Sequence, residues 1–259
     1  MNNLKGKSAL VTGATSGIGE AVAKMLAQMG VNVILHGRDD ERLQTLQTKL
    51  QRDYNTIETI SFDVRNKKET ISKIEELLKK REIDILINSA GLAVGFDRFD
   101  EGNIEDWEEM IDANVKGLLY TTRLILPQMR KRDKGHIVNL GSIAGIMAYP
   151  KGNVYCATKA AVGMLSDALN VDLADTNIRV SCVEPGAVET NFSNVRFKGD
   201  TKKAKKVYEG YKPLSAEDVA YLIIYILNVP DHVNIQHALI MPTAQRNPYI
   251  LNREKKDDK

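Results

Sequence analysis

Short apolar runs recur along the chain and alternate with longer stretches whose apolar residues follow helical spacing. The runs most typical of buried strands are Ser8–Val11, Val31–Leu35, Ile57–Phe62, Ile83–Ile87, His136–Leu140, Arg179–Val183 and Ala238–Met241. Continuous apolar runs of this length indicate strands that are covered on both faces, which is typical of parallel sheets with helical connections. The pattern therefore predicts an α/β fold with a single doubly wound parallel sheet and helices on both faces.

The chain shows no sign of a second domain. Its 259 residues lie within the usual range for one α/β domain, and neither an internal repeat nor a low-complexity linker interrupts them. We expect one folded domain over residues 1–246. Residues 247–259, which end in a run of charged side chains, are expected to form a C-terminal tail that is poorly folded by itself.

A glycine-rich turn, Thr12-Gly13-Ala14-Thr15-Ser16-Gly17-Ile18-Gly19, follows the first predicted strand and leads into a segment with helical periodicity. In such a unit Gly13 permits a tight turn, Gly17 lets backbone approach a pyrophosphate, and Gly19 allows the helix to pack closely on the strand. The free N–H groups of the helix N-terminus suit anionic oxygens. The arrangement predicts a Rossmann fold that binds a dinucleotide.

Tyr155 and Lys159 are four residues apart, thirteen residues after Ser142. On a helix, residues with this spacing share a face, so the Lys159 ammonium would lie one turn beyond the Tyr155 phenol. A nearby cation favours phenolate, so we expect Lys159 to bring the Tyr155 pKa down from about 10 towards neutrality. The constellation predicts a group that moves a proton to or from a substrate oxygen.

The end of the second predicted strand indicates which dinucleotide binds. Proteins that prefer NAD usually place Asp or Glu there, whereas this chain has His36-Gly37-Arg38. Gly37 leaves room, and the forked Arg38 guanidinium suits a 2′-phosphate. Asp39 and Asp40 come later and are expected to cap the next helix. NADP is therefore the expected cofactor.

Charge and cysteine content narrow the possible classes of protein. The 36 basic and 34 acidic residues give a net charge of +2, so bulk charge favours neither nucleic acid nor a membrane as partner. No apolar stretch is long enough to span a bilayer, and the first residues do not resemble a signal peptide, so we expect a cytoplasmic protein. Cys156 and Cys182 are the only cysteines, and the four histidines lack zinc-site spacing, so no metal site is expected.

The motif series resembles the short-chain dehydrogenase/reductase family over nearly the whole chain. The matching elements, in order, are T-G-x-x-x-G-I-G at residues 12–19, Asn88-Ser89-Ala90-Gly91, Asn114, Ser142, Tyr155-x-x-x-Lys159 and Pro185-Gly186. Ser89 departs from the pattern, since the family more often has a second Asn there. Residues 192–200, 232–235 and 241–245 further resemble a narrower branch, the NADP-dependent 3-hydroxy acid dehydrogenases, which include serine dehydrogenases and malonic semialdehyde reductases.

The resemblance implies roles for individual residues. Ser142 would polarise the substrate carbonyl, Tyr155 would supply the proton in reduction, Lys159 would hold the nicotinamide ribose and Asn114 would keep a water in the proton relay. Asp63 and Val64 would flank the adenine, and Asn88 would support the adenosine ribose. The complete set of implied cofactor-binding residues is Gly13, Thr15, Ser16, Gly17, Ile18, Gly19, Arg38, Asp63, Val64, Asn88, Ala90, Gly91, Tyr155, Lys159, Pro185, Gly186, Val188 and Thr190.

The substrate is expected to be a small 3-hydroxy acid of the serine or 3-hydroxypropionate type, or its carbonyl form. We expect a substrate lid around residues 187–212, in which Arg196 binds the substrate carboxylate while Ser142 and Tyr155 bind the reacting oxygen. An alternative role for Arg196 is pairing with protein carboxylates or with cofactor phosphates. A 3-oxoacyl or general ketone or aldehyde reductase remains an alternative activity, and a non-catalytic NADP-binding sensor remains an alternative of another class.

Two long helical segments, around Asp106–Met129 and Asn153–Leu173, carry more apolar positions than one sheet face needs. Association between helices of different subunits would cover such positions. The family resemblance implies a homotetramer.

Overall fold

The computed structural model describes residues 3–254, which form a seven-stranded sheet with the strand order β3-β2-β1-β4-β5-β6-β7. All neighbouring strands are parallel. The strands are β1 (Ser8–Thr12), β2 (Asn32–Gly37), β3 (Ile57–Ser61), β4 (Ile85–Asn88), β5 (Gly135–Leu140), β6 (Ile178–Pro185) and β7 (His237–Ile240). Each coincides with a predicted strand to within two residues at either end. The predicted fold class is therefore confirmed.

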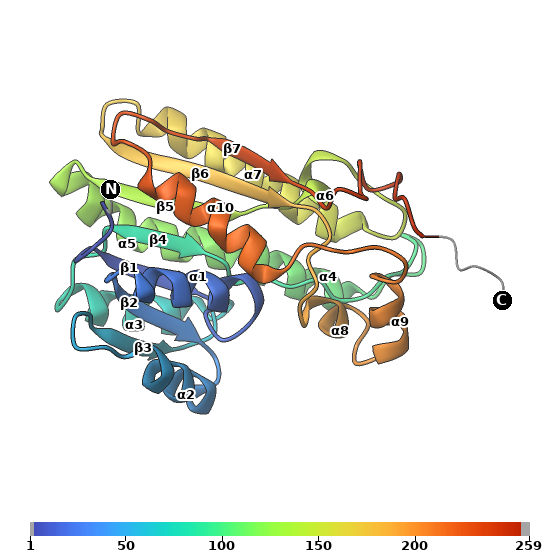
Figure 1. Ribbon diagram of the computed structural model, residues 1–259, viewed down its shortest axis with the longest axis horizontal. Coiled ribbons are helices and arrows are strands. Elements are labelled where there is room, and N and C mark those ends of the chain that lie inside the picture. The colour runs from blue at the N-terminus through green and yellow to red at the C-terminus, as the bar shows by residue number, and fades with distance from the viewer. Residues whose placement is uncertain (1–2, 255–259) are drawn as a thin grey trace.

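Helices cover both faces of this sheet (Figure 1). One face packs against α1 (Gly17–Gln28), α2 (Asp40–Leu50) and α10 (Ala216–Asn228). The other packs against α3 (Lys67–Leu78), α5 (Leu118–Arg132) and α7 (Asn153–Asp172). Four short helices lie in the connections that follow the strands: α4 (Ile104–Ile111), α6 (Ile143–Ile146), α8 (Phe192–Arg196) and α9 (Thr201–Lys206).

The alternation of side chains along each strand supplies both layers of the core. Val11 packs in the cluster under α1 and α10, whereas its neighbour Leu10 packs in the cluster under α3 and α5. Both side chains are completely buried. Residues on both faces of a central strand must be apolar for this reason, which is why continuous apolar runs identify the strands.

The expected lid projects beyond the sheet, with α8 and α9 side by side in Figure 1. The expected tail reaches this region. Tyr249 donates a hydrogen bond to the carbonyl of Ala148, and the backbone N–H of Glu254 donates to the carbonyl of Gly210 at 2.7 Å. Residues 247–254 are thus held by tertiary contacts, which a sequence pattern does not reveal, and residues 255–259 lie outside the described residues. No helix within residues 3–254 is long and apolar enough to cross a membrane.

Candidate active site

The glycine turn after β1 has the backbone that its sequence requires. Gly13 and Gly17 adopt φ angles of +68° and +55°, a region that residues with a side chain rarely enter. A Cβ on Gly19 would lie 2.4 Å from the carbonyl oxygen of Gly13, so only glycine lets α1 start this close to the turn. Ser16 is the N-cap of α1 and its side chain makes no capping hydrogen bond within the described residues. The turn therefore presents backbone N–H groups and a hydroxyl to an anionic ligand.

The His36 side chain contacts the glycine turn and holds it in position, a role that the sequence pattern did not reveal. Its Nδ1 accepts a hydrogen bond from the Gly13 N–H at 3.3 Å, and its Nε2 lies 3.0 Å from the carbonyl oxygen of Phe62. These contacts require a neutral ring with the proton on Nε2. Burial lowers the pKa of His36 to about 4, which keeps the ring neutral. His36 thus joins the glycine turn to the end of β3.

Gly37 is the last residue of β2 and Arg38 follows it, at the position where a 2′-phosphate is expected. A Cβ on Gly37 would lie 2.8 Å from Cγ2 of Thr15, so this position brings β2 against the glycine turn. The Arg38 side chain is 61% exposed and its Nη1 lies 3.7 Å from a carboxylate oxygen of Asp63, too far for a hydrogen bond. Asp39 caps α2 by accepting from the Arg42 N–H, as expected. The Arg38 guanidinium is therefore accessible to a ligand.

Asp63 and Val64 follow β3, and the Asp63 carboxylate lies near the Arg38 guanidinium. Arg65 binds both carboxylate oxygens of Asp63 and also contacts Glu109 at 2.5 Å. Burial acts to raise the pKa of Asp63, but the hydrogen bonds and charge of Arg65 prevail and hold that pKa below its usual value. Asp63 is therefore an ionised carboxylate whose position is fixed by the protein.

The structure limits how Asn88 could support the adenosine ribose, which stays a prediction. Its amide nitrogen donates to the hydroxyl of Thr122 at 2.9 Å and to the amide oxygen of Asn139 at 2.8 Å, and its amide oxygen accepts from Thr121 at 2.8 Å. The side chain is thus directed into the interior between β4 and α5. Only the backbone of Asn88 is left for a ligand, because the buried side chain already has its partners inside the protein.

The structure brings Ser142, Tyr155 and Lys159 together. Ser142 is the N-cap of α6, directly after β5, and its side chain hydrogen-bonds the Tyr155 phenol. Tyr155 and Lys159 lie on the first turns of α7, and the Lys159 ammonium donates to the carbonyl oxygen of Leu140 at 2.6 Å. A Cβ on Gly91 would lie 3.8 Å from Lys159 Nζ, so the segment after β4 borders the same site. The group can exchange protons with an oxygen bound at Tyr155.

The electrostatics differ from the expectation that Lys159 lowers the pKa of Tyr155. Burial raises that pKa above its usual value, Tyr149 adds to the effect, and the hydrogen bond from Ser142 and the charge of Arg196 oppose it. Lys159 is not among the largest influences on it. Burial also lowers the pKa of Lys159 itself to about 8. Desolvation outweighs the expected attraction here because both groups are buried while the ammonium is directed at the Leu140 carbonyl.

Asn114 lies in a π-helical turn, Asp112–Gly117, between α4 and α5. Its side chain accepts from the Leu92 N–H, and donates to the Leu92 carbonyl and to the Thr158 hydroxyl, at 2.8–3.0 Å. Regular α-helix is therefore interrupted at Asn114 by a π turn. The side chain positions the segment after β4 against α7, so a water held by this residue would have to use its backbone carbonyl.

The segment after β6 passes over the glycine turn. The Gly186 N–H donates to the carbonyl of Ile240 at 2.8 Å, which fixes Pro185-Gly186 beside β7. A Cβ on Gly17 would lie 3.4 Å from the Thr190 side chain. Val188 pairs with Leu214 in an isolated bridge. Thr190 therefore lies where it can share an anionic ligand with the glycine turn.

Arg196 lies among three aromatic rings at the end of α8. Its guanidinium carbon is 4.7 Å from the ring centroid of Phe96, 5.3 Å from that of Tyr149 and 5.5 Å from that of Tyr155. Its Nη1 donates to the Tyr149 hydroxyl at 2.6 Å, while its buried Nε has no hydrogen-bond partner among the described residues. A buried donor without a partner is costly, and a ligand with an acceptor oxygen would satisfy it.

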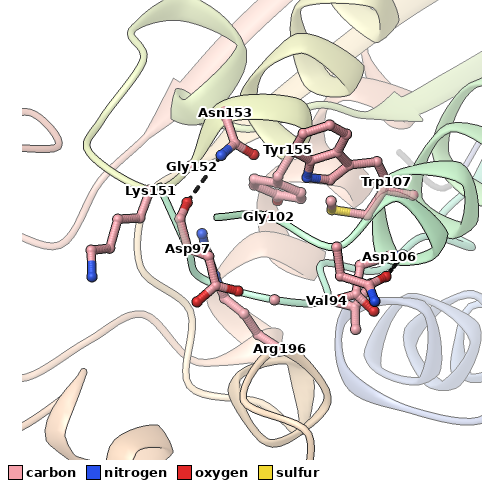
Figure 2. Close-up of a pocket in the computed structure, with 13 residues that line it drawn as sticks. Val94, Asp97, Gly102, Asp106, Trp107, Lys151, Gly152, Asn153, Tyr155 and Arg196 are labelled. Carbon is pink, nitrogen blue, oxygen red and sulfur yellow. Dashed lines mark hydrogen bonds between the residues drawn. The ribbon is translucent and has the colours of Figure 1, made fainter. Parts of the chain in front are cut away.

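A cavity lies next to Tyr155, and Arg196 of the expected lid is among the residues that line it (Figure 2). Figure 2 shows Tyr155, Trp107 and Arg196 around it, with Asp97 and Asn153 joined by a hydrogen bond. The cavity encloses only about 10 Å³, roughly the space that one water molecule needs. The cavity as it stands is therefore too small to hold a substrate.

Two contacts hold the lid against the segment that follows β4. The Gly95 N–H donates to the carbonyl oxygen of Arg196 at 3.0 Å. The Lys198 ammonium lies 2.8 Å from a carboxylate oxygen of Asp106. Neither Tyr149 nor Phe96 was expected at the site, because a lone aromatic residue in a loop carries no motif.

The chain is similar to known proteins over most of its length. A family model described as short chain dehydrogenase matches residues 7–201. The chain is 46% identical over 242 residues to the NADP-dependent 3-hydroxy acid dehydrogenase YdfG of Salmonella typhi, covering 91% of this chain and 95% of that protein. It is 41% identical over 248 residues to the NADP-dependent 3-hydroxy acid dehydrogenase of Schizosaccharomyces pombe, covering 95% and 96%.

A solved structure described as the closed form of serine dehydrogenase complexed with NADP+ is similar over the whole fold. It superposes with a TM-score of 0.87 at 45% identity, and the match covers 96% of this chain and 100% of that one.

Proposed function

This chain belongs to the short chain dehydrogenase family, and from that premise we propose that it is an NADP-dependent oxidoreductase that interconverts a small 3-hydroxy acid and its carbonyl form. The family and branch that the motifs indicated are confirmed by relatives and by a solved structure. Serine and 3-hydroxypropionate represent the proposed substrate class. The proposal that the substrate is a carboxylic acid rests on one observation. The Arg196 guanidinium, whose buried Nε has no hydrogen-bond partner among the described residues, lies 5.5 Å from the Tyr155 ring.

The residues around the glycine turn fit NADP. Backbone N–H groups within residues 15–19 and the side chains of Ser16 and Thr190 would hold the pyrophosphate, and Arg38 would hold the 2′-phosphate. No carboxylate occupies position 37, so a 2′-phosphate meets no repulsion there. When bound, NADP supplies the hydride acceptor or donor for the carbinol carbon.

The remaining chemistry is proton transfer by this chain's own residues. In reduction, Ser142 donates a hydrogen bond to the substrate carbonyl oxygen and Tyr155 gives that oxygen its proton. In oxidation the same phenol oxygen takes the proton from the hydroxyl. Lys159 lies one turn further along α7, where its ammonium can hold the nicotinamide ribose, and Asn114 fixes the loop that borders it.

The Arg196 side chain would bind the substrate carboxylate. Guanidinium matches a carboxylate in a two-pronged pair, and the rings of Phe96, Tyr149 and Tyr155 exclude water from it. A charge-assisted pair of this kind contributes about 1.5–3 kcal/mol. We propose that residues 187–212 act as the lid, which brings Arg196 to the substrate when it closes.

We also propose a homotetramer in the cytoplasm. Several apolar side chains on the outer helices and on the edge strand are more than 40% exposed, among them Met164, Val171, Tyr221, Tyr225 and Leu239. Burial of such side chains between subunits is favourable at about 25 cal/mol per Å². Sedimentation velocity at micromolar protein concentration distinguishes a tetramer from a monomer, and a monomer would exclude this proposal.

A substrate panel followed by NADPH absorbance tests the activity. The panel contains L- and D-serine, 3-hydroxypropionate, a neutral secondary alcohol and a 3-oxoacyl thioester, each with NADP(H) and with NAD(H). We expect the highest catalytic efficiency for a 3-hydroxy acid with NADP. A preference for the thioester would favour the 3-oxoacyl reductase alternative. Tight NADP binding without turnover of any compound would favour the sensor alternative.

A further inference from the structure

The sheet edge formed by β6 and β7 brings three side chains with metal-binding atoms onto one face. Cys182 and Glu184 are two residues apart on β6, so their side chains point to the same side of the sheet. His237 on β7 is the direct partner of Cys182 in the strand pairing. The helix α7 covers this face, and its residue Asp167 lies next to His237.

The atoms are close enough for one ion. The thiol sulfur of Cys182, a carboxylate oxygen of Glu184 and a ring nitrogen of His237 all lie within 4.8 Å of one another. His237 Nδ1 and Glu184 Oε1 are 3.2 Å apart. Bond lengths of about 2.0–2.3 Å in a tetrahedral zinc site place its ligand atoms roughly 3.3–3.8 Å apart. Small side-chain rotations therefore suffice to close the triangle around an ion.

His237 also has the second partner that metal-binding histidines use. Its Nε2 lies 2.7 Å from a carboxylate oxygen of Asp167, which leaves Nδ1 directed at Glu184. A carboxylate on the far ring nitrogen orients the imidazole and makes the near nitrogen a better ligand. The two carboxylates raise the pKa of His237 above its usual value, with Asp167 the larger influence and burial opposing them.

We propose that Cys182, Glu184 and His237 form a binding site for a divalent transition metal ion of the zinc class, with Asp167 as the outer partner of His237. None of the four residues lines the cavity at Tyr155. The ion would enter past His237, whose side chain is 38% exposed, and a water would complete the tetrahedron. The charge of Lys159 acts on Cys182, but the test of metal binding does not use the proposed activity.

The ligand types select the ion. A thiolate with an imidazole and a carboxylate suits zinc or cobalt and does not suit magnesium or calcium, which prefer oxygen. Binding displaces the proton of the Cys182 thiol and any proton on His237 Nδ1. Burial raises the pKa of Cys182 to about 11, so the ion must displace that proton and affinity should increase with pH. The Ser166 hydroxyl helps, because its hydrogen bond acts to lower that pKa.

The ion would link β6, β7 and α7 at one edge of the sheet. β7 is the last strand of the sheet and its side chains are only partly buried. An ion bound to β6 and β7, with Asp167 of α7 behind it, would stabilise that edge. No sequence motif indicates such a site, because His237 is 53 residues from Glu184 and no short spacing links them.

Cobalt titration tests the proposal on full-length protein without an affinity tag, treated with chelator and kept reduced with a phosphine. We expect one Co²⁺ per chain, with a thiolate-to-cobalt charge-transfer band in the near ultraviolet and ligand-field bands in the visible. Added Zn²⁺ should remove these bands. It should also raise the thermal unfolding midpoint of the wild type, since an ion that binds only the folded chain stabilises it.

Matched variants identify the ligands. Cys182→Ser should lose the charge-transfer band, and the other buried cysteine supplies the control, because Cys156→Ser should keep it. His237→Gln, at a partly exposed position that should not affect folding, should lose both the bands and the zinc-dependent shift in unfolding. Asp167→Asn should weaken binding about 10- to 100-fold. Absence of the band in the wild type, or its persistence in Cys182→Ser or His237→Gln, would overturn the proposal.

Discussion

The guanidinium carbon of Arg196 lies 5.5 Å from the centroid of the Tyr155 ring. The two residues come from opposite sides of the site, Arg196 from the lid and Tyr155 from α7. The cation opposes the burial that raises the pKa of Tyr155. In the proposed function, closure of the lid would therefore couple recognition of a negatively charged substrate to the acid strength of the phenol.

Tyr149 should act by positioning Arg196. The change Tyr149→Phe removes the hydroxyl that accepts from Arg196 Nη1 at 2.6 Å and keeps the ring. Loss of a net hydrogen-bond contribution of about 0.5–1.5 kcal/mol corresponds to roughly two- to thirteenfold weaker binding. We expect KM for a 3-hydroxy acid to increase by this factor, with little change in kcat. Steady-state kinetics with the acid and its methyl ester checks this, since a change shared equally by both substrates would argue against a role through Arg196.

Tyr155 should be the proton donor and acceptor. Tyr155→Phe removes the phenol oxygen and leaves the ring that packs 5.5 Å from Phe192. We expect turnover to fall at least ~10²-fold, the lower end for loss of a general acid, while calorimetry finds NADP binding nearly unchanged. Tyr221→Phe, on the exposed face of α10, is the matched control and should retain wild-type turnover. Near-normal turnover in Tyr155→Phe would show that another group supplies the proton.

Arg38 should determine the preference for NADP. Arg38→Gln removes an exposed cation, and loss of a charge-assisted contact to the 2′-phosphate should weaken NADP+ binding roughly 10- to 150-fold, with little effect on NAD+. Arg42→Gln, one turn further along and paired with Asp39, is the control. Gly37→Asp is a less selective change, because its Cβ would lie 2.8 Å from Thr15. An unchanged NADP+/NAD+ ratio in Arg38→Gln would mean that the phosphate is held elsewhere.

The strands and the glycine turn could be predicted because their causes are local. Val11 and Leu10 must both be apolar when each faces a helical layer, and Gly13 and Gly17 must be glycine at positive φ. Such requirements are visible within a few residues of sequence. The same is true of Tyr155 and Lys159, whose spacing fixes a shared helix face.

Features that depend on distant contacts were not predictable in this way. The direction of the Asn88 side chain follows from hydroxyls on α5, more than 30 residues away. The position of Arg196 depends on Tyr149, 47 residues earlier. The pKa of Tyr155 depends on how deeply the folded chain buries it, and a sequence pattern gives the neighbours of a group but not its desolvation.

His36 should make stability depend on pH on the acid side. Burial lowers its pKa in the folded state to about 4, against 6.5 in the unfolded chain, so the unfolded state binds the extra proton between these values. The free energy of unfolding should therefore fall as pH decreases from 6.5 to 4, by on the order of 3 kcal/mol from this residue. We expect the change in the free energy of unfolding between these two pH values, measured with denaturant, to be smaller in His36→Gln than in the wild type by about this amount. A profile identical to that of the wild type would mean that His36 is not held neutral in the fold.

The central claim is that the lid cation selects an acid for the chemistry at Tyr155. Its most direct test is the ratio of kcat/KM for a 3-hydroxy acid to that for its uncharged methyl ester, in the wild type and in Arg196→Met. We predict that the variant loses roughly 10- to 150-fold for the acid and little for the ester, as expected from a charge-assisted pair of about 1.5–3 kcal/mol. An equal loss for both substrates would contradict the claim and would show that Arg196 only holds the lid in place.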